Sequence, residues 1–378
     1  MKHDNPFFFG GVVEEEDFCD REDELNSLEK DVLSGINVLL YAPRRFGKTS
    51  LLLASLKRLK NKGVKGVYID LFPVSSEEEF LNLYFGAVVF SLEGSVERVI
   101  RTIRETLKFK PSFSVNVDSE GRTSFRLDFG RVQKDKTFEE VIDLPFRYAE
   151  KRGSKLCVVL DEFQEIYRLG LEAKLRSAVQ KHSRKVSYLF SGSRKSILEK
   201  MFSDRREPFY RSVKKVSLNP IGEKEWIPFI RERFERTGKS IPVEFIEEGV
   251  KLLEGHPQGV QEFFHFLWEE TDKVVDRGSF LRAMDKLLET EKDTFWFMWE
   301  ELTNIQRKVL KLIAYTDGVE VYRRENLERF SLSANSVQKA VGSLIEKDVI
   351  ERKGKKLVFQ NPIVKLWLRR ELNPSVFP

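Results

Sequence analysis

Tyr41-Ala42-Pro43-Arg44-Arg45-Phe46-Gly47-Lys48-Thr49-Ser50 is the stretch from which the fold of this chain can be worked out. It follows an apolar run at residues 36–40 and precedes another at residues 51–53. Such a pattern predicts a buried strand, a tight loop and a helix. The Gly-Lys-Thr that ends the loop has the form of a phosphate-binding loop, in which backbone N–H groups and the dipole of a helix N-terminus favour an anion.

The residues of this loop have different predicted parts. Lys48 is expected to reach the outer phosphates of a nucleotide and to take part in catalysis, and the Thr49 hydroxyl is expected to ligate Mg²⁺. Gly47 lets the backbone approach the phosphates without a Cβ. Ala42 stands where the usual motif has its first glycine, so the loop must begin in an ordinary backbone conformation. The predicted nucleotide-binding residues of this stretch are Ala42, Pro43, Arg44, Arg45, Phe46, Gly47, Lys48, Thr49 and Ser50.

Composition narrows the class of protein. A chain of 378 residues predicts two or three domains. Its two cysteines do not make a disulfide framework, and its first residues do not read as a signal peptide. The longest uncharged apolar run, at residues 80–92, is too short to span a bilayer. We therefore expect a cytoplasmic protein that does not bind a membrane.

The net charge of +5 is unevenly distributed. Residues 302–378 carry fifteen Lys and Arg against eight Asp and Glu, so the positive excess lies in the last fifth of the chain. This asymmetry suggests an anionic partner for that end, such as a nucleic acid.

Strands and helices alternate over the first part of the chain. After the strand that precedes the loop, apolar strands are predicted at residues 67–72, 156–160, 186–190 and 214–218. Alternation of this kind predicts an α/β fold, in which a parallel sheet has helices on both faces. Two further runs, at residues 113–118 and 123–129, alternate apolar and polar residues around Ser119-Glu120-Gly121 and predict a β-hairpin inserted at the edge of the sheet. The segment at residues 138–151 is predicted as a single helix.

Active sites of parallel sheets lie at the carboxyl ends of the strands, so the loops after residues 40, 160 and 190 should converge. Asp161 is expected to hold the Mg²⁺ shell, and Glu162 to polarise the water that attacks the γ-phosphate. Ser191 or Ser193 would sense the γ-phosphate, although a plain serine-glycine turn is an equal alternative.

Arginines near the last strand of the sheet offer a charge-stabilising group for phosphoryl transfer. Arg205, Arg206 and Arg211 are the candidates, and we assign this part to Arg211. A solvated basic loop explains the same residues as well.

The remainder of the chain changes pattern twice. From residue 223 to about 294 it is helical, and His256-Pro257, at a break in this segment, is expected either to contact the nucleotide base or to form an interhelical turn. From residue 302 three helices and a basic hairpin at residues 349–359 have the order of a winged helix. The predicted domains are a P-loop core at 1–220 with an N-terminal segment and a hairpin insertion near 112–129, a helical lid at 221–300 and a winged helix at 301–378.

Over nearly the whole chain these residues resemble the archaeal-type ATPases, of the AAA+/STAND branch of P-loop proteins. Asp-Glu-Phe-Gln at 161–164 and Gly-His-Pro at 255–257 are more specific than the phosphate-binding loop alone. The other matching stretches are residues 18–25, 47–49, 190–193 and 361–367.

The resemblance implies an ATPase core, a helical lid and a C-terminal winged helix. It would place Asp20 and Arg21 near the adenine edge, and Pro257 where the lid contacts the base. Ala42 departs from the glycine of the family, which bears on the rate of turnover more than on binding.

These observations predict a protein that binds ATP with Mg²⁺, hydrolyses it slowly to ADP and phosphate, and switches conformation, so that the lid relaxes and the winged helix is re-aimed. Two interpretations of the winged helix stay open. It binds double-stranded DNA, or it is a protein-interaction module or a brake on the ATPase. In the DNA interpretation the groove-facing residues are Asn335, Ser336, Gln338 and Lys339, and the phosphate contacts are Arg352, Lys353, Lys355 and Lys356. A further alternative is a nucleotide-locked signalling switch that holds ADP.

Overall fold

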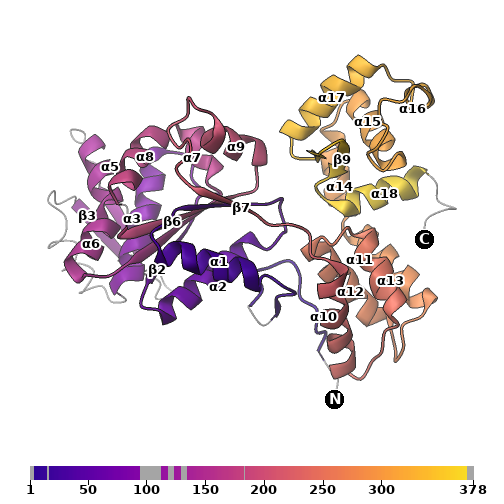
Figure 1. The fold of residues 1–378 in the computed structure, drawn as a ribbon, viewed down its shortest axis with the longest axis horizontal. Coiled ribbons are helices and arrows are strands. Elements are labelled where there is room, and N and C mark those ends of the chain that lie inside the picture. The colour runs from indigo at the N-terminus through magenta and orange to yellow at the C-terminus, as the bar shows by residue number, and fades with distance from the viewer. Residues whose placement is uncertain are drawn as a thin grey trace. The chain divides into compact units, whose positions relative to one another are not determined.

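The computed structural model describes residues 4–14, 17–93, 112–117, 123–128, 134–182 and 184–372 (Figure 1). The chain divides into two compact units. We call the unit made of Arg21–Ala42 and Lys48–Leu218 the sheet unit. The helical unit is made of Met1–Asp20, Pro43–Gly47 and Asn219–Pro378, so most of the phosphate-binding loop is grouped with residues far from it in sequence.

The sheet unit has a five-stranded sheet in the order β2-β5-β6-β1-β7, and every neighbouring pair of strands is parallel. Its strands are β1 (Val38–Tyr41), β2 (Lys65–Asp70), β5 (Leu156–Asp161), β6 (Val186–Gly192) and β7 (Lys214–Ser217). Every residue of β5 and β6 is buried. Because successive side chains of a strand point to opposite faces, both faces of the sheet are covered there. The predicted α/β fold with a parallel sheet is confirmed.

The helices described in the sheet unit precede these strands in the chain or lie between them. They are α1 (Glu22–Leu33), α2 (Lys48–Asn61), α3 (Glu77–Glu93), α5 (Lys134–Ile142), α6 (Leu144–Arg152), α7 (Gln164–Leu169), α8 (Glu172–Lys181) and α9 (Lys195–Ser203). The single helix predicted over residues 138–151 is wrong, because the segment is broken at Asp143 into α5 and α6. Pro145 lies in the first turn of α6, where its missing N–H costs nothing, whereas within a continuous helix it would remove a hydrogen bond.

The predicted hairpin is present as the antiparallel strands β3 (Ser112–Val117) and β4 (Thr123–Asp128). These strands form a sheet of their own and do not extend the five-stranded sheet, which differs from the edge position predicted above. β4 lies beside α3. The predicted turn at residues 119–121 lies outside the described residues.

The helical unit begins with five consecutive helices. They are α10 (Glu223–Arg236), α11 (Val243–Leu252), α12 (Pro257–Glu270), α13 (Arg277–Thr290) and α14 (Lys292–Glu300). The N-terminal residues, which the sequence grouped with the P-loop core, belong to this unit. Phe7 is buried against Phe234 and Phe264, with ring centroids 5.7 Å and 6.1 Å away. The segment therefore contributes to the core of the helices.

The remainder of the helical unit has the parts predicted for a winged helix. These are α15 (Asn304–Tyr315), α16 (Arg324–Arg329), α17 (Ala334–Glu346), the antiparallel pair β8 (Ile350–Lys353) and β9 (Lys356–Phe359), and α18 (Pro362–Leu372). Thr303 and Gln306 form a capping box at the start of α15. Ser333 accepts a hydrogen bond from the Ser336 amide and caps α17.

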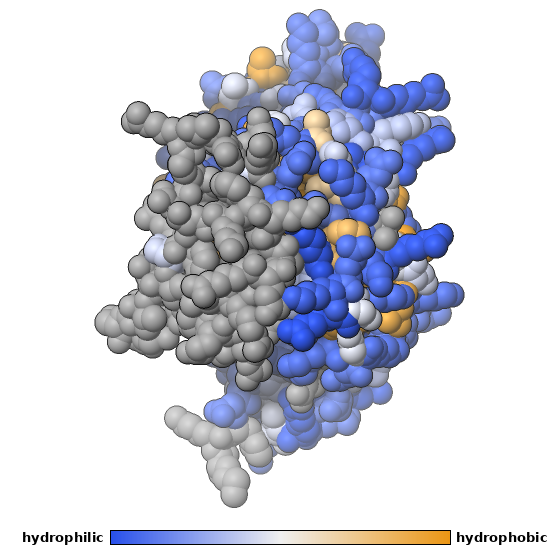
Figure 2. Space-filling view, turned by 90° about the vertical axis from the view of Figure 1, so that its left-hand side faces the viewer, coloured by the Kyte–Doolittle hydropathy of each residue, from blue (hydrophilic) through white to orange (hydrophobic). Residues whose placement is uncertain are grey.

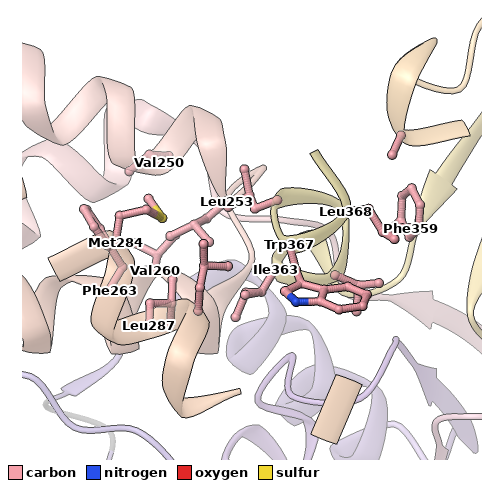
Figure 3. Packing of buried hydrophobic residues seen from close by; sticks show 14 of the residues in the cluster. Val250, Leu253, Val260, Phe263, Met284, Leu287, Phe359, Ile363, Trp367 and Leu368 are labelled. Carbon is pink, nitrogen blue, oxygen red and sulfur yellow. The ribbon is translucent and has the colours of Figure 1, made fainter. Parts of the chain in front are cut away.

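One hydrophobic core joins the five helices to the winged helix. A single cluster of buried side chains contains Val260 and Leu287 from the helices as well as Phe359, Ile363 and Trp367 from the C-terminal part. Figure 3 shows that the side chains of α18 bridge the two groups. We conclude that the helices and the winged helix are packed as one body.

The molecular face shown in Figure 2 is mainly hydrophilic outside its grey atoms, with hydrophobic residues only in small groups. Among the residues that the structure describes, none of the helices has both the length and the apolar character needed to cross a bilayer.

Candidate nucleotide site

The phosphate-binding loop lies between the end of β1 at Tyr41 and the start of α2 at Lys48. Gly47 has a φ of +81°, in the left-handed region, and a Cβ there would meet no atom within 4 Å. The conformation of the backbone, rather than lack of space, is therefore what requires glycine. Arg45 also has a positive φ of 67°. Ala42 is absent from the positive-φ residues, so the expected ordinary conformation at the start of the loop is present.

The side chain of Lys48 reaches back to the first residues of its own loop. Its side chain is buried, and its ammonium group donates a hydrogen bond to the Ala42 carbonyl at 3.0 Å. A buried ammonium group needs such partners because desolvation disfavours its charge. The contact places the positive charge beside the backbone that the phosphates would approach.

Asp161 joins α2 to the end of β5. Its Oδ2 accepts hydrogen bonds from the Thr49 hydroxyl at 2.8 Å and from the Tyr68 hydroxyl at 2.9 Å, and its Oδ1 accepts one from the Glu162 amide at 3.0 Å. Burial, together with the negative charge of Asp161, raises the pKa of Tyr68 far above its usual value, so the phenol stays a donor. The carboxylate is thus fixed against the threonine that the sequence paired with it.

Glu162 follows in the left-handed backbone region, with a φ of 53°. Its carboxylate accepts a hydrogen bond from the Gln164 amide group and another from the Ser193 hydroxyl at 3.1 Å. Gly192 makes this arrangement possible, because a Cβ there would lie 2.2 Å from Gln164 Oε1. Two donors from neighbouring segments therefore hold the carboxylate.

The two candidate serines at the end of β6 differ in their surroundings. Ser191 is completely buried, and its hydroxyl has no hydrogen-bond partner within the described part of the chain. Its carbonyl accepts a hydrogen bond from the Phe163 amide at 2.7 Å and ties β6 to the turn after β5. Ser193 is the serine whose hydroxyl contacts Glu162.

Three further predicted site residues are Arg211 and Arg21 of the sheet unit and Asp20 of the helical unit. Arg211 is exposed, and its guanidinium lies over the Tyr210 ring, 5.2 Å from the centroid. Arg21 is buried and donates to Glu24 at 2.8 Å. Asp20 is exposed, and Asp20 and Arg21 are consecutive residues with φ near 90° (90° and 94°). Backbone conformations of this kind cost free energy and are common at functional sites.

Within the helical unit, His256 and Phe46 connect the loop to α12. His256 Nδ1 accepts the hydrogen bond of the Gly259 amide at 3.1 Å, so the proton is on Nε2, and the ring bonds to the Arg44 backbone. Burial, assisted by the charge of Arg45, lowers the pKa of His256 to about 4 and keeps the ring neutral at neutral pH. The Phe46 ring meets the His256 ring edge-on at 4.9 Å. Pro257 is the first residue of α12 and directly follows His256.

The Arg45 side chain pairs with a buried acid from the junction of α13 and α14. Its guanidinium donates to Glu291 at 2.9 Å. Burial, and then the charge of Glu291, raises the pKa of nearby Glu262 to about 7. Glu262 Oε2 and Glu291 Oε2 are buried without a hydrogen-bond partner in the described part of the chain. Arg45 is therefore the cation that faces two buried carboxyl groups.

Residues 18–263 match the sequence profile of a family described as an ATPase domain predominantly from Archaea. The chain belongs to this archaeal ATPase family. Residues 293–370 match a second profile, described as a probable winged helix domain. The resemblance stated from the sequence is thereby confirmed, while the parts of individual residues stay predictions. No curated protein matches the chain.

Solved structures with the same fold cover nearly the whole of this archaeal ATPase. A Walker-type ATPase of Pyrococcus abyssi is 22% identical, with a TM-score of 0.67 over 96% of this chain and 99% of that one. The ORC2 protein of Aeropyrum pernix, in ADPNP–ADP complexes, is 14% identical, with a TM-score of 0.56 over 96% and 100%. The ORC1 protein of Aeropyrum pernix, in complex with DNA, is 15% identical, with a TM-score of 0.51 over 97% and 96%.

Sequence reasoning missed several residues of this archaeal ATPase that contact a predicted site residue within their own unit. Tyr68 lies in the middle of β2, where a tyrosine reads as part of a half-buried strand. Gln164 is part of the recognised motif Asp-Glu-Phe-Gln, but its contact with Glu162 depends on a turn that the sequence does not specify. Glu262 and Glu291 carried no signal, since Arg45 is 246 positions away from Glu291.

The oxygen atoms at the start of α2 and the end of β5 fit a magnesium ion. Thr49 and Asp161 supply a hydroxyl and a carboxylate, which are hard ligands of the kind that Mg²⁺ takes together with phosphate oxygens. Their mutual hydrogen bond shows that the two oxygen atoms lie next to each other.

Proposed function

We propose that this archaeal ATPase binds ATP with Mg²⁺ and hydrolyses it slowly to ADP and phosphate, as a conformational switch. The observation that carries the proposal is the hydrogen bond of 2.8 Å between Thr49 and Asp161, at the end of β5. It joins the two motifs that the sequence could only place on separate segments. Family membership and the loop between Tyr41 and Lys48 support the choice of nucleotide.

The proposed parts of the residues follow from these contacts. The backbone N–H groups of residues 44–48 and the ammonium group of Lys48 bind the phosphates. Thr49 and Asp161 would hold Mg²⁺, whose charge would offset the negative charge of the phosphates. Glu162 orients the attacking water and accepts its proton.

The contacts of Glu162 support slow turnover. Its carboxylate accepts hydrogen bonds from Gln164 and Ser193. Both donors bond to Oε2, so a water molecule must either displace one of them or bind at Oε1. Of the two candidates, Ser191 and Ser193, we propose Ser193 as the serine that senses the γ-phosphate, because its hydroxyl bonds to Glu162 and could turn toward a phosphate.

Two variants test the proposal. Lys48→Ala should abolish tight ATP binding, measured by calorimetry, because the phosphates lose their buried cation. Glu162→Gln should bind ATP as tightly as the unchanged protein but release phosphate at least about a hundredfold more slowly, within the usual range for a general base. Equal phosphate release by the Glu162→Gln variant and the unchanged protein would remove Glu162 from the mechanism.

For the winged helix we propose contact with double-stranded DNA. The outward side chains of α17, Asn335, Gln338 and Lys339, are exposed, whereas Ser336 is half-buried and bonds to the Ser333 hydroxyl. ORC1 of Aeropyrum pernix, whose fold is similar, was solved with DNA. The exposed side chains favour major-groove contact by α17.

The four basic residues of the wing fall into two pairs. Lys353 pairs with Glu351 at 3.0 Å and Lys356 pairs with Asp317 at 2.8 Å, so their charges are partly neutralised. Arg352 and Lys355 are exposed and line one surface cavity together with Arg323. We therefore propose Arg352 and Lys355 as the phosphate contacts.

Titration of a labelled duplex at several salt concentrations tests this proposal. Binding should weaken with salt, and an Arg352→Ala/Lys355→Ala variant should lower the log–log slope by about two, since each phosphate contact contributes roughly 0.9. The matched change Lys353→Ala/Lys356→Ala should lower it less. Absence of salt-sensitive binding would instead support a winged helix that binds protein, and ADP retained by the purified protein, identified by mass spectrometry, would support the nucleotide-locked switch.

A further inference from the structure

Two side chains of the phosphate-binding loop, Arg45 and Phe46, contact residues from the helices of the helical unit. Residues Pro43–Gly47 are grouped with that unit, whereas Lys48 and Thr49, which follow directly, belong to the sheet unit. The loop is therefore joined covalently at both of its ends to the sheet unit, while its own residues belong to the unit that carries the winged helix. The question is which contacts hold it there.

Two contacts hold consecutive residues of the loop. His256, which caps α12, bonds through its ring to the Arg44 backbone and packs against Phe46. Arg45, between them, pairs with Glu291 at 2.9 Å. Three successive residues are thus fixed by groups from α12 and from the residue that joins α13 to α14.

The ion pair of Arg45 joins a side chain that is 38% exposed to a carboxylate that is buried. The side chain of Glu291 is 9% exposed, and Glu262 is 1% exposed. Both carboxyl groups have an oxygen without a hydrogen-bond partner in the described part of the chain. Removing Arg45 would leave the buried Glu291 carboxylate without this ion-pair partner, which is strongly unfavourable. Arg45 is therefore retained at Glu291 rather than released to a phosphate.

We propose that Glu291 positions the phosphate-binding loop through Arg45, so that this contact sets nucleotide affinity and carries the nucleotide state into the helical unit. Glu291 is a positioning residue and does not touch the nucleotide. The inference rests on the proposed function, since it assumes that the loop binds phosphates. It differs from a direct role of Arg45, in which its guanidinium leaves Glu291 and binds the ligand.

The direction in which the ATP affinity of a Glu291→Gln variant changes distinguishes positioning by Glu291 from direct phosphate binding by Arg45. Glu291→Gln keeps the shape of the side chain and the charge of Arg45 but removes the attraction between them. If Glu291 positions the loop, ATP binding should weaken by about tenfold, equivalent to roughly 1.4 kcal/mol. If Arg45 binds phosphate directly, the freed guanidinium should leave affinity unchanged or strengthen it, and that result would overturn the proposal.

The matched control is Glu248→Gln, which removes a carboxylate that pairs with Arg277 at 2.7 Å on the surface of the same unit. This variant should bind ATP like the unchanged protein. Thermal unfolding of both variants shows whether the helical unit is folded, and Glu291→Asp, which keeps the charge, should retain part of the affinity. Loss of affinity in Glu248→Gln as great as in Glu291→Gln would contradict a specific role of Glu291.

Hydrogen exchange gives a measurement that should not change if Glu291 only stabilises the fold. On addition of ATP to the unchanged protein, the Gly259 amide, which donates to His256, should change its protection, because the loop and the start of α12 respond together. In Glu291→Gln saturated with ATP this response should be smaller. An unchanged protein that binds no ATP would instead refute the proposed function, whereas ATP binding with an equal response in both proteins would refute only the role of Glu291.

Discussion

At the scale of single residues, the hydrogen bonds of Glu162 depend on close packing around Gly192. A Cβ on Gly192 would lie 2.2 Å from Gln164 Oε1 and 3.0 Å from Leu198 Cδ1. Gln164 can reach Glu162 only because position 192 has no side chain. The turn after β5 therefore packs closely on the end of β6, to which the bonds Ser193–Glu162 and Phe163–Ser191 also tie it.

Replacing Gln164 by leucine should raise the rate of ATP hydrolysis. The change removes one of the two donors that occupy the Glu162 carboxylate, so we expect kcat to rise roughly threefold to tenfold, while the affinity for ATP stays similar. Steady-state phosphate release measures this. Arg168→Gln, which removes a surface ion pair with Glu165 on the same helix, serves as the control. A fall in kcat would show instead that Gln164 orients Glu162 for catalysis.

The buried carboxyl group of Glu262 should make stability depend on pH. Burial raises its pKa in the folded chain to about 7 from a reference value of 4.5, so folding takes up a proton and its penalty grows as pH rises between these values. Glu262→Gln should therefore stabilise the helical unit at about pH 8, by up to about 3 kcal/mol, and hardly at all at about pH 4. Chemical denaturation at both pH values measures the difference. Equal effects of the substitution at the two pH values would contradict the buried charge.

At the scale of elements, the break between α5 and α6 shows what periodicity hides. Residues 138–151 keep a helical pattern, but Asp143 ends α5 and its carboxylate bonds to His182 at 2.8 Å. His182 is completely buried and also bonds to the Tyr188 hydroxyl. Although burial raises the pKa of Asp143, the hydrogen bond and charge of His182 outweigh it and lower the pKa below its usual value.

This polar contact gives a prediction about acid stability. Because the pKa of Asp143 is lower in the folded chain, its stabilising contribution is present above the unfolded pKa and disappears as pH falls through the folded pKa. Asp143→Ala should cost about 1–3 kcal/mol at neutral pH, since it leaves buried His182 without this partner. The loss of stability caused by the substitution should become smaller in acid, because Asp143 of the unchanged protein is then protonated. A cost that stays constant with pH would argue against an ionised Asp143.

The strands and the motifs at their ends were predictable because each depends on local sequence. A wholly apolar run such as residues 156–160 specifies a covered strand, and Gly47-Lys48-Thr49 specifies a loop with known chemistry. The contacts of Tyr68 and Glu291 were not predictable, since they depend on strand order and on packing between distant helices. The hairpin was predicted from alternation, but alternation does not say which surface it covers.

At the scale of the whole molecule, Trp367 shows how the winged helix is held. Its ring packs against Phe295, Trp296 and Trp299 of α14, with centroids 6.1, 5.8 and 5.6 Å away. The cluster is part of the core that runs from the five helices into the winged helix (Figure 3). A shared core means that the two parts gain and lose their structure together.

Trp367→Ala should therefore destabilise the whole helical unit. We expect a cost of about 3–5 kcal/mol, as for other buried tryptophans, and a single unfolding transition that includes residues of both α13 and α17. Hydrogen exchange across the unit measures both. Phe297→Ala, on the same helix α14 but 72% exposed, should cost less than about 0.5 kcal/mol. Separate transitions for the helices and the winged helix would show that the common core does not couple them.

ATP affinity measured by calorimetry with and without Mg²⁺, for the unchanged protein and for Asp161→Asn, tests the central claim most directly. If Lys48, Thr49 and Asp161 bind one Mg²⁺–triphosphate, Mg²⁺ should strengthen binding to the unchanged protein by about tenfold or more, and Asp161→Asn should lose most of that gain while it still binds the nucleotide without metal. The account would be contradicted by an unchanged protein that does not bind ATP, or by an equal gain from Mg²⁺ in both proteins.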